Sequence, residues 1–431
     1  MSKKSVAILG PQEYMAEALK GLEEKYDVQK IFPKGWTHEE MDQVAKDCKD
    51  KGIKVVAGFA QKDAFHHILI NERLGNKVPS RMAFLYCMNK FLMRKLESKP
   101  FWFDSVDPRT ETNEQIIAKI KEWPFMLKNT SLSLGRGIFK IDNAEELKQV
   151  CDDYRKDKAL QDQIDYQNKC ISEGIPEKDM PPLPAFVAEH MVDMQICIEY
   201  CYEGYVTADG KIVHYGFTDE VYFANHQALG YLTPPWHFPA NKAHLVEAYI
   251  EDYMGRLAKL GYLNQFFNIE LWITPDDTIY LVEINPRAAH SYHYNYLYSY
   301  NCSLFADNIE LAHTGSEPPT TPWKKWKDGT HDKYTLIVLI TGKELGLVSD
   351  VLEYKYVDYL ESDEKILIRH CRKRGDVLTD NDMTAAGVML LQMWITGKTA
   401  QDCVNKEIEI RSKIYKKFVD PGYPDIWKKS N

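Results

Sequence analysis

Short apolar runs alternate with helical stretches over the first 88 residues of the chain. The runs predict buried strands, and the longer stretches, whose apolar residues recur at helical spacing, predict amphipathic helices. Regular alternation of strands with helices is typical of a parallel sheet covered by helices. We therefore predict a small parallel α/β domain with strands at residues 6–9, 28–32 and 53–57 and helices at residues 13–24 and 39–50.

Two further patterns follow this domain. Apolar positions at helical spacing over residues 84–98 predict one helix, which contains Lys90. Residues 125–127 and 138–139 are strand-like, and a polar segment of small residues lies between them. Small residues let a backbone approach phosphate oxygens, so this segment is a candidate phosphate-binding loop with Lys128 at its entrance. The alternatives are a solvated helix lysine at position 90 and an ordinary hairpin with a polar loop.

The most informative strand pattern lies at residues 266–290. Two apolar stretches flank the segment Pro275–Thr278, whose composition is that of a four-residue hairpin loop. A register that pairs Thr274 with Ile279 across this loop would bring the polar residues of both strands onto one face. The stretch therefore predicts an antiparallel hairpin with one polar face.

In that register Glu270 lies opposite Glu283, with Asn285 on the same face. Two carboxylates directly opposite each other repel, and a divalent cation between them removes the conflict. Carboxylate and amide oxygens are ligands that Mg²⁺ accepts, and Arg287 adds a positive charge at the same edge. The alternative is a surface hairpin with solvated acidic residues. Against it, Glu283 interrupts an otherwise apolar run, so its carboxylate is expected to be covered.

Composition narrows the class of protein. The 431 residues carry a net charge of −9 with no basic block, which argues against a nucleic-acid binder. No apolar run reaches the length of a membrane span, and the start of the chain is too short in its apolar part for a signal peptide. The nine cysteines are scattered without metal-site spacing. They predict reduced thiols in a cytoplasmic protein.

The pattern of Glu270, Glu283, Asn285 and Arg287, written E-(x)n-E-x-N-P-R, resembles the metal-binding signature of the ATP-grasp superfamily. Among its members, the chain is most similar to the carboxylate–amine and amino-acid ligases. The resemblance implies an α/β fold built from an N-terminal parallel α/β domain, a two-lobed ATP-grasp nucleotide domain and a C-terminal α/β module. The implied boundaries are residues 1–88 for the first domain, 89–185 and 186–318 for the small and large lobes, and 319–431 for the module.

The same resemblance assigns residues to the nucleotide phosphates. Lys90 takes the place of the lysine at the start of the family's helix, with Asn89 in place of the usual Asp. The segment after residue 127 resembles the family's K-P-x-x-x-S-G-S-R-G-V loop. The matching residues are Lys128, Ser133, Arg136 and Gly137.

The adenine and ribose positions are implied in the same way. Glu189 corresponds to the acidic residue of the family's hinge, and the backbone from Glu189 to Met191 would contact the adenine edge. Gln195 stands where the family has a ribose-binding Glu, and Glu199 is a second candidate for that role. Glu220 stands where a Lys is common in amino-acid ligases.

The implied reaction activates a carboxylate as an acyl phosphate, which an amine then attacks. ATP and two Mg²⁺ (or Mn²⁺) ions are the expected cofactors, with Glu270, Glu283 and Asn285 as metal ligands. Arg287 would hold the transferring group, and His290 would line the acceptor pocket, unless His290 and the tyrosines that follow it pack in the core. The expected partners are a small-molecule carboxylate and an amine, without nucleic acid or membrane, and a homodimer stays open.

Two other functions stay open. One is an ATP-dependent carboxylase of the biotin-carboxylase or purine-pathway type, in which bicarbonate is the acid that is phosphorylated. The other is a nucleotide-binding protein that has lost catalysis, which Asn89, Gln195 and Glu220 favour. The intact pair Glu270 and Glu283 argues against this second alternative.

Overall fold

A parallel three-stranded sheet begins the chain. The computed structural model describes residues 3–34, 37–59, 64–132, 137–193, 197–223, 228–383, 387–417 and 422–423. The predicted parallel sheet is confirmed, with the strand order β2-β1-β3. Its elements are β1 (Lys4–Leu9), η1 (Glu13–Met15), α1 (Ala16–Lys25), β2 (Tyr26–Ile31), α2 (His38–Asp50), β3 (Val55–Gly58) and α3 (Ala64–Leu74).

The helix predicted at residues 84–98 is wrong, because the structure has two shorter helices there. They are α4 (Arg81–Met88) and α5 (Lys90–Leu96), and Asn89 stands between them with extended backbone angles. The Asn89 side chain accepts a hydrogen bond from the backbone N–H of Leu92 at 3.1 Å. Asparagine is among the best helix N-caps, so it starts a new helix where apolar spacing alone predicts continuation. Lys90 is thereby the first residue of α5.

A four-stranded antiparallel sheet follows, in the order β4-β7-β5-β6. Its apolar face shares one core with three helices. Because the strand at residues 186–190 pairs with β4 and β5, it belongs to this sheet, although the sequence division at residue 186 places it in the next lobe. The elements are β4 (Phe103–Val106), α6 (Asn113–Lys119), β5 (Phe125–Asn129), β6 (Ile138–Ile141), α7 (Ala144–Lys156), α8 (Lys158–Ser172) and β7 (Phe186–His190).

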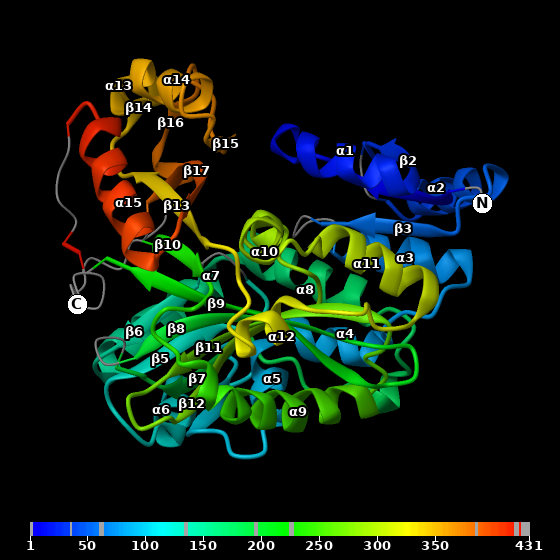
Figure 1. Cartoon of the computed structure of the whole chain (residues 1–431). Helices are drawn as coiled ribbons and strands as arrows, with labels where there is room; N and C mark the ends of the chain where they lie inside the picture. Colours follow the sequence, from blue (N-terminus) through cyan, green and yellow to red (C-terminus); the bar gives the residue numbers. More distant parts are fainter. Residues whose placement is uncertain are drawn as a thin grey trace.

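The large sheet has eight strands in the order β12-β11-β8-β9-β10-β13-β17-β15. It runs without a break from the hairpin β11–β12 into the C-terminal strands, because β13 pairs with β10. Figure 1 shows the long helix α9 (Ala243–Lys259) beneath it. The strands are β8 (Ile198–Val206), β9 (Ile212–Tyr222), β10 (Ala228–Thr233), β11 (Gln265–Ile273), β12 (Ile279–Asn285), β13 (Tyr334–Gly342), β15 (Leu367–His370) and β17 (Val388–Gly397).

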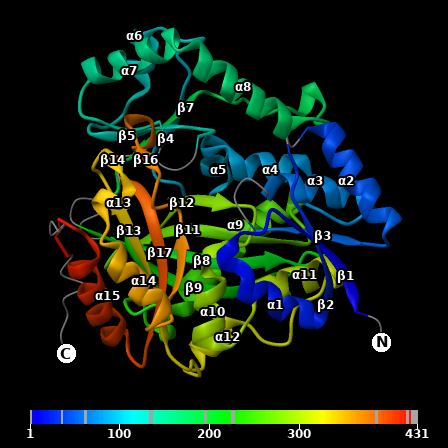
Figure 2. The same cartoon turned by 90° about the horizontal axis from the view of Figure 1, so that it is seen from above.

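In Figure 1 the N-terminal domain and the C-terminal strands β13, β15 and β17 stand above the rest of the large sheet, and Figure 2 shows the helices α6, α7 and α8 to one side. None of the described helices is long and apolar enough to cross a membrane. The remaining elements are α10 (His293–Tyr300), α11 (Leu304–Thr314), α12 (Pro322–Lys327), β14 (Gly346–Leu347), α13 (Val348–Val351), α14 (Tyr354–Ser362), β16 (Val377–Leu378) and α15 (Ala400–Ile414), with single 3₁₀ turns between them.

Candidate active site

The hairpin β11–β12 places Glu270 opposite Glu283, as the sequence predicts. The predicted pairing next to the turn is wrong, since Ile273 and not Thr274 lies opposite Ile279. A five-residue loop with Asp277 in the left-handed region (φ 66°) closes the hairpin. The register then shifts by one residue between Glu270 and Leu271, at a β-bulge. The one-residue error in the predicted turn pairing is therefore offset by the one-residue shift at the bulge, and Glu270 still lies opposite Glu283.

Neighbouring strands add more carboxylates to the same face. Glu199 on β8 lies opposite Glu220 on β9, and Glu270 lies opposite Cys201 on β8. Glu220 accepts hydrogen bonds from the Cys201 thiol at 3.0 Å and from the Tyr222 hydroxyl at 2.8 Å. Burial raises the pKa of Glu270 well above its usual range, and the charges of Glu283, Glu220 and Glu199 raise it further. The face therefore concentrates negative charge where a cation would relieve it.

Glu203 is a further buried acid that the sequence analysis did not single out. It is fully buried, and its Oε1 accepts hydrogen bonds from the Asn268 amide at 3.0 Å and the Ala289 backbone N–H at 3.1 Å. Among the described residues its Oε2 has no hydrogen-bond partner. Burial raises the pKa of Glu203 well above its usual range, while the nearby Arg287 opposes that shift. Its alternation with Cys201 and Glu199 along one strand was the signal that could have found it.

Asn285 and Arg287 lie at the end of the acidic face. The Asn285 amide approaches Asn268 Oδ1 at 3.3 Å and Glu283 Oε1 at 3.4 Å, and Arg287 Nη2 lies 3.5 Å from Asn285 Oδ1. In the part of the chain that the structure describes, no three His, Cys, Asp or Glu side chains form a preformed metal centre. The donors present are carboxylate and amide oxygens, which suit Mg²⁺ or Mn²⁺ completed by ligand phosphates and water.

Lys90 connects the phosphate segment with the acidic hairpin. Its Nζ donates to the Leu132 carbonyl at 2.7 Å and lies 3.7 Å from Glu283 Oε2. Its backbone N–H donates to the Thr130 carbonyl at 2.9 Å. The ammonium is therefore fixed between the end of β5 and the acidic pair, and the solvated-lysine alternative does not describe it.

Lys128 and Glu189 form a buried ion pair in the four-stranded sheet. Lys128 Nζ lies 2.5 Å from Glu189 Oε1, and Arg94 Nε lies 2.8 Å from Glu189 Oε2. Burial alone would raise the pKa of Glu189, but Arg94 and Lys128 together lower it to about 2. Lys128 also lies 5.6 Å from the ring of Trp272, whose indole N–H donates to Glu199 at 2.8 Å. The pair thus faces the large sheet.

The other residues assigned to the nucleotide fall into two groups. Ser133, Arg136 and Gln195 lie outside the described residues. Gly137 has a φ of 68°, and a Cβ there would come 2.8 Å from the Cβ of Asn129. Its carbonyl accepts from the Asn129 backbone N–H at 2.7 Å, so glycine is required where the loop rejoins the sheet. Met191 follows β7 directly and is partly exposed.

His290 lies beside an arginine that the sequence did not connect with it. Its Nε2 is 3.1 Å from Nη1 of Arg369. Arginine only donates, so Nε2 accepts and the proton of the neutral ring is on Nδ1. Burial, Arg369 and Arg287 together lower the pKa of His290 to about 3. The neutral imidazole therefore positions Arg369 and is a poor proton acceptor near neutral pH.

The aromatic residues after His290 pack in the core. Tyr292 is 4% exposed and donates to the Cys201 thiol at 2.8 Å, and His293 is 1% exposed and stacks on Phe305 with 4.0 Å between ring centres. The packing alternative for these two residues is the one that their contacts support.

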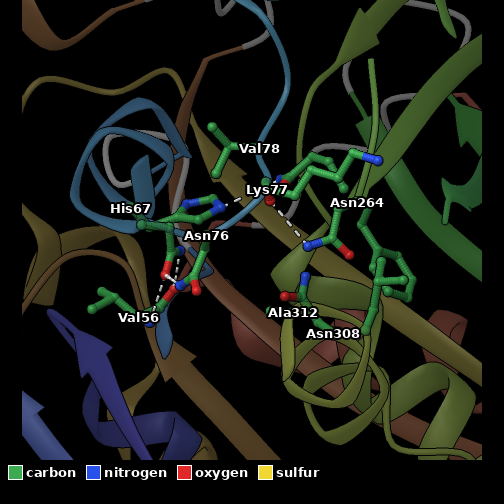
Figure 3. Close-up of a pocket in the computed structure, with 12 residues that line it drawn as sticks. Val56, His67, Asn76, Lys77, Val78, Asn264, Asn308 and Ala312 are labelled. Atoms are coloured by element: carbon green, nitrogen blue, oxygen red, sulfur yellow. Dashed lines mark hydrogen bonds between the residues drawn. The ribbon is translucent and has the colours of Figure 1, made fainter. Parts of the chain in front are cut away.

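A small polar cavity lies behind the end of the hairpin, between α3, the start of β11 and α11 (Figure 3). Its volume of about 20 Å³ suits ordered water rather than a substrate. Gln265 lines it, donating to the Pro286 carbonyl at 2.9 Å and lying 3.3 Å from His67 Nε2. Gln265 therefore connects His67 of the N-terminal domain with Pro286, the residue before Arg287.

No protein-family model matches this sequence, and no curated protein sequence matches it either. Solved structures are similar over nearly the whole chain. An L-amino acid ligase from Bacillus licheniformis is 14% identical, with a TM-score of 0.72 over 96% of this chain and 98% of that one. The biotin carboxylase domain of a 2-oxoglutarate carboxylase from Hydrogenobacter thermophilus is 13% identical, with a TM-score of 0.65 over 96% of this chain and 90% of that one.

A third similar structure is N5-carboxyaminoimidazole synthetase from Staphylococcus aureus, complexed with ADP. It is 15% identical, with a TM-score of 0.61 over 95% of this chain and 97% of that one. All three structures match the fold of this chain over nearly its whole length. The chain therefore has the fold of the ATP-grasp ligases.

Proposed function

We propose that the chain is an ATP-dependent ligase that joins a carboxylate to an amine, with an amino acid or small carboxylic acid as the acid substrate. The observation that carries this proposal is the acidic pair Glu270 and Glu283, which ends at Asn285 and Arg287 and has the ammonium of Lys90 beside it. A face that gathers so many carboxylates needs cations to balance their charge. The ligase fold of the chain supports the same conclusion.

In the proposed reaction an oxygen of the substrate carboxylate attacks the γ-phosphorus of ATP, and ADP leaves. The amine nitrogen then attacks the acyl carbon, phosphate leaves, and the nitrogen loses one proton. Glu270, Glu283 and Asn285 would hold the Mg²⁺ (or Mn²⁺) ions, two in our proposal, which neutralise phosphate charge when bound. Arg287 has fixed planar donors that suit the transferring phosphoryl group or the acyl oxygens.

The nucleotide side of the proposal uses residues of both sheets. Lys90, Lys128, Gly137 and the neighbouring Ser133 and Arg136 would bind the phosphates. The Glu189 side chain is already held by two cations, which leaves the backbone from Glu189 to Met191 for adenine. Gln195 and Glu199 would bind the ribose.

The experiment measures ADP release from Mg-ATP by the purified protein with pools of the twenty amino acids. We expect release that requires both an acid and an amine, and a product with a new amide bond. ADP release that depends on bicarbonate instead would favour a carboxylase, since one of the similar structures reported above is named as a biotin carboxylase domain. Binding of Mg-ADP without release under any condition would favour a protein that has lost catalysis.

We further propose a cytoplasmic location. All nine cysteines are free thiols in the structure, and most are buried. A homodimer is a proposal that size-exclusion chromatography with light scattering would test.

A further inference from the structure

Arg369 brings the C-terminal module to the candidate site. It lies on β15, an edge strand of the large sheet, and Figure 1 shows this strand on the side of the module that faces the N-terminal domain. Its Nη1 contacts His290 Nε2 at 3.1 Å and donates to Gln392 Oε1 at 3.0 Å. Its guanidinium carbon lies 5.0 Å from the ring centre of Tyr14, which belongs to η1. Three parts of the fold therefore meet at one cation.

The charge of Arg369 is not balanced within the described part of the chain. A guanidinium has five N–H donors, and both hydrogen bonds above use Nη1. No described carboxylate lies within ion-pair distance of this half-buried group. Other buried arginines have such partners, because Arg94 pairs with Glu97 and Glu189 and Arg411 pairs with Glu407. An anionic ligand could therefore accept hydrogen bonds from the remaining N–H donors of Arg369 and balance its charge.

The surroundings hold Arg369 in a fixed position. Tyr14 stacks on Trp394 with 5.6 Å between ring centres and 9° between planes. The Trp394 indole N–H donates to the Ser291 carbonyl at 3.0 Å, directly after His290. Tyr14 is 93% buried, its exposed fraction being 7%, and its hydroxyl has no hydrogen-bond partner among the described residues. The guanidinium of Arg369 is therefore held against a packed aromatic cluster, which preorganises it for a ligand.

We propose that Arg369 binds the carboxylate of the amine substrate, which makes that substrate an amino acid rather than a simple amine. This rests on the ligase function proposed above. A carboxylate that is to be phosphorylated needs a free oxygen beside Arg287 and the acidic pair. A guanidinium that holds both oxygens suits a carboxylate that does not react. Arg369 contacts His290, which lies three residues after Arg287 in the chain. This contact places its guanidinium beside the site, where it could hold the second carboxylate.

The competing explanation is that Arg369 only joins the N-terminal domain to the C-terminal module. Both roles would make its loss destabilising, so thermal stability cannot separate them. Selectivity for a ligand carboxylate can, because a structural arginine does not distinguish an amino acid from its amide.

The test is calorimetric titration of the full-length protein, saturated with Mg-ADP, with each of the twenty L-amino acids and the matching carboxamides. We expect at least one amino acid to bind and its carboxamide to bind at least 10-fold more weakly. Arg369→Gln should lower the affinity for that amino acid by about 10- to 100-fold, and Arg369→Lys should lower it by less. Arg374→Gln, which removes an exposed arginine of the same module that pairs with Asp358, should leave the affinity unchanged.

Equal binding of the acid and the amide, an unchanged affinity in folded Arg369→Gln, or binding of no amino acid at all would overturn the proposal. If Arg369→Gln does not fold, the acid and amide comparison on the native protein decides. Mg-ADP binding is recorded first in every titration. Its absence would contradict the ligase function itself, whereas its presence without carboxylate selectivity contradicts only the role of Arg369.

Discussion

The Nζ atom of Lys90 lies 3.7 Å from Oε2 of Glu283, although the two residues belong to different parts of the fold. Lys90 starts α5 and also donates to the Leu132 carbonyl, while Glu283 lies on β12 of the acidic hairpin β11–β12. The contact is a single ammonium facing several carboxylates, so it leaves most of their charge unbalanced. That imbalance is the basis for the predictions on the metal site.

Glu283→Gln should abolish ADP release, because glutamine cannot supply the anionic oxygen that Mg²⁺ requires. The same change should leave the ligand-free protein at least as stable, since it removes a charge that raises the pKa of Glu270. Initial rates of ADP release and the thermal midpoint without ligand measure the two effects.

The matched control for that variant is Asp276→Asn, which removes an acid from the exposed loop of the same hairpin. It should keep normal turnover. Near-native turnover in Glu283→Gln would remove this residue from the metal site.

Lys128→Ala should weaken ATP binding by about 1.5–3 kcal/mol, the loss of one charge-assisted contact. The fold should persist because Arg94 still pairs with the buried Glu189, although the thermal midpoint should fall. Titration with a non-hydrolysable ATP analogue measures the affinity. Lys140→Ala, which removes an exposed lysine of β6 that pairs with Asp142, is the control. Equal affinities of the two variants would show that Lys128 only balances the charge of Glu189 and does not bind the nucleotide.

The sequence placed Glu270 and Glu283 in one hairpin, but their exact pairing was correct only because the error in the predicted turn pairing is offset by the β-bulge. The sequence did not show that Glu203 and Glu220 share a sheet face with this pair, because their strands reach β11 only through pairing between residues that are distant in sequence. The apolar spacing predicts one continuous helix, but Asn89 divides it because its side chain caps the start of a new helix. Arg369 is separated from His290 by 79 residues, and nothing in its local pattern indicates that contact.

In the absence of ligand, stability should fall as the pH rises above 4.5, the ordinary pKa of a glutamate. Burial raises the pKa of Glu199, Glu203 and Glu270 above the ordinary value of 4.5. The folded protein then binds these protons more tightly than the unfolded chain does, so their contribution is complete below 4.5 and is lost as pH rises through the raised values. Glu189 acts in the opposite direction, since its pKa of about 2 contributes stability that is lost only as pH falls below 4.5.

Thermal midpoints at about pH 6 and about pH 8 test this dependence. We expect a lower midpoint at the higher pH, a smaller difference with Mg-ADP present, and a smaller difference in Glu270→Gln. A midpoint that rises with pH in the ligand-free protein would contradict the raised pKa values of the acidic face.

His290→Asn should lower the substrate-dependent rate without changing ATP affinity. The pKa of His290 is about 3, so the ring is neutral at working pH and supplies an acceptor for Arg369 rather than a base for the amine. Asparagine keeps an acceptor oxygen but on a shorter side chain, and His290→Gln reaches further. We therefore expect glutamine to restore more activity than asparagine, and the pH–rate profile of both variants to keep the shape of the native one. Loss of a single ionisation from that profile in either variant would instead identify His290 as the group that accepts the proton. A fall in folded protein with normal specific activity would assign His290 to packing alone.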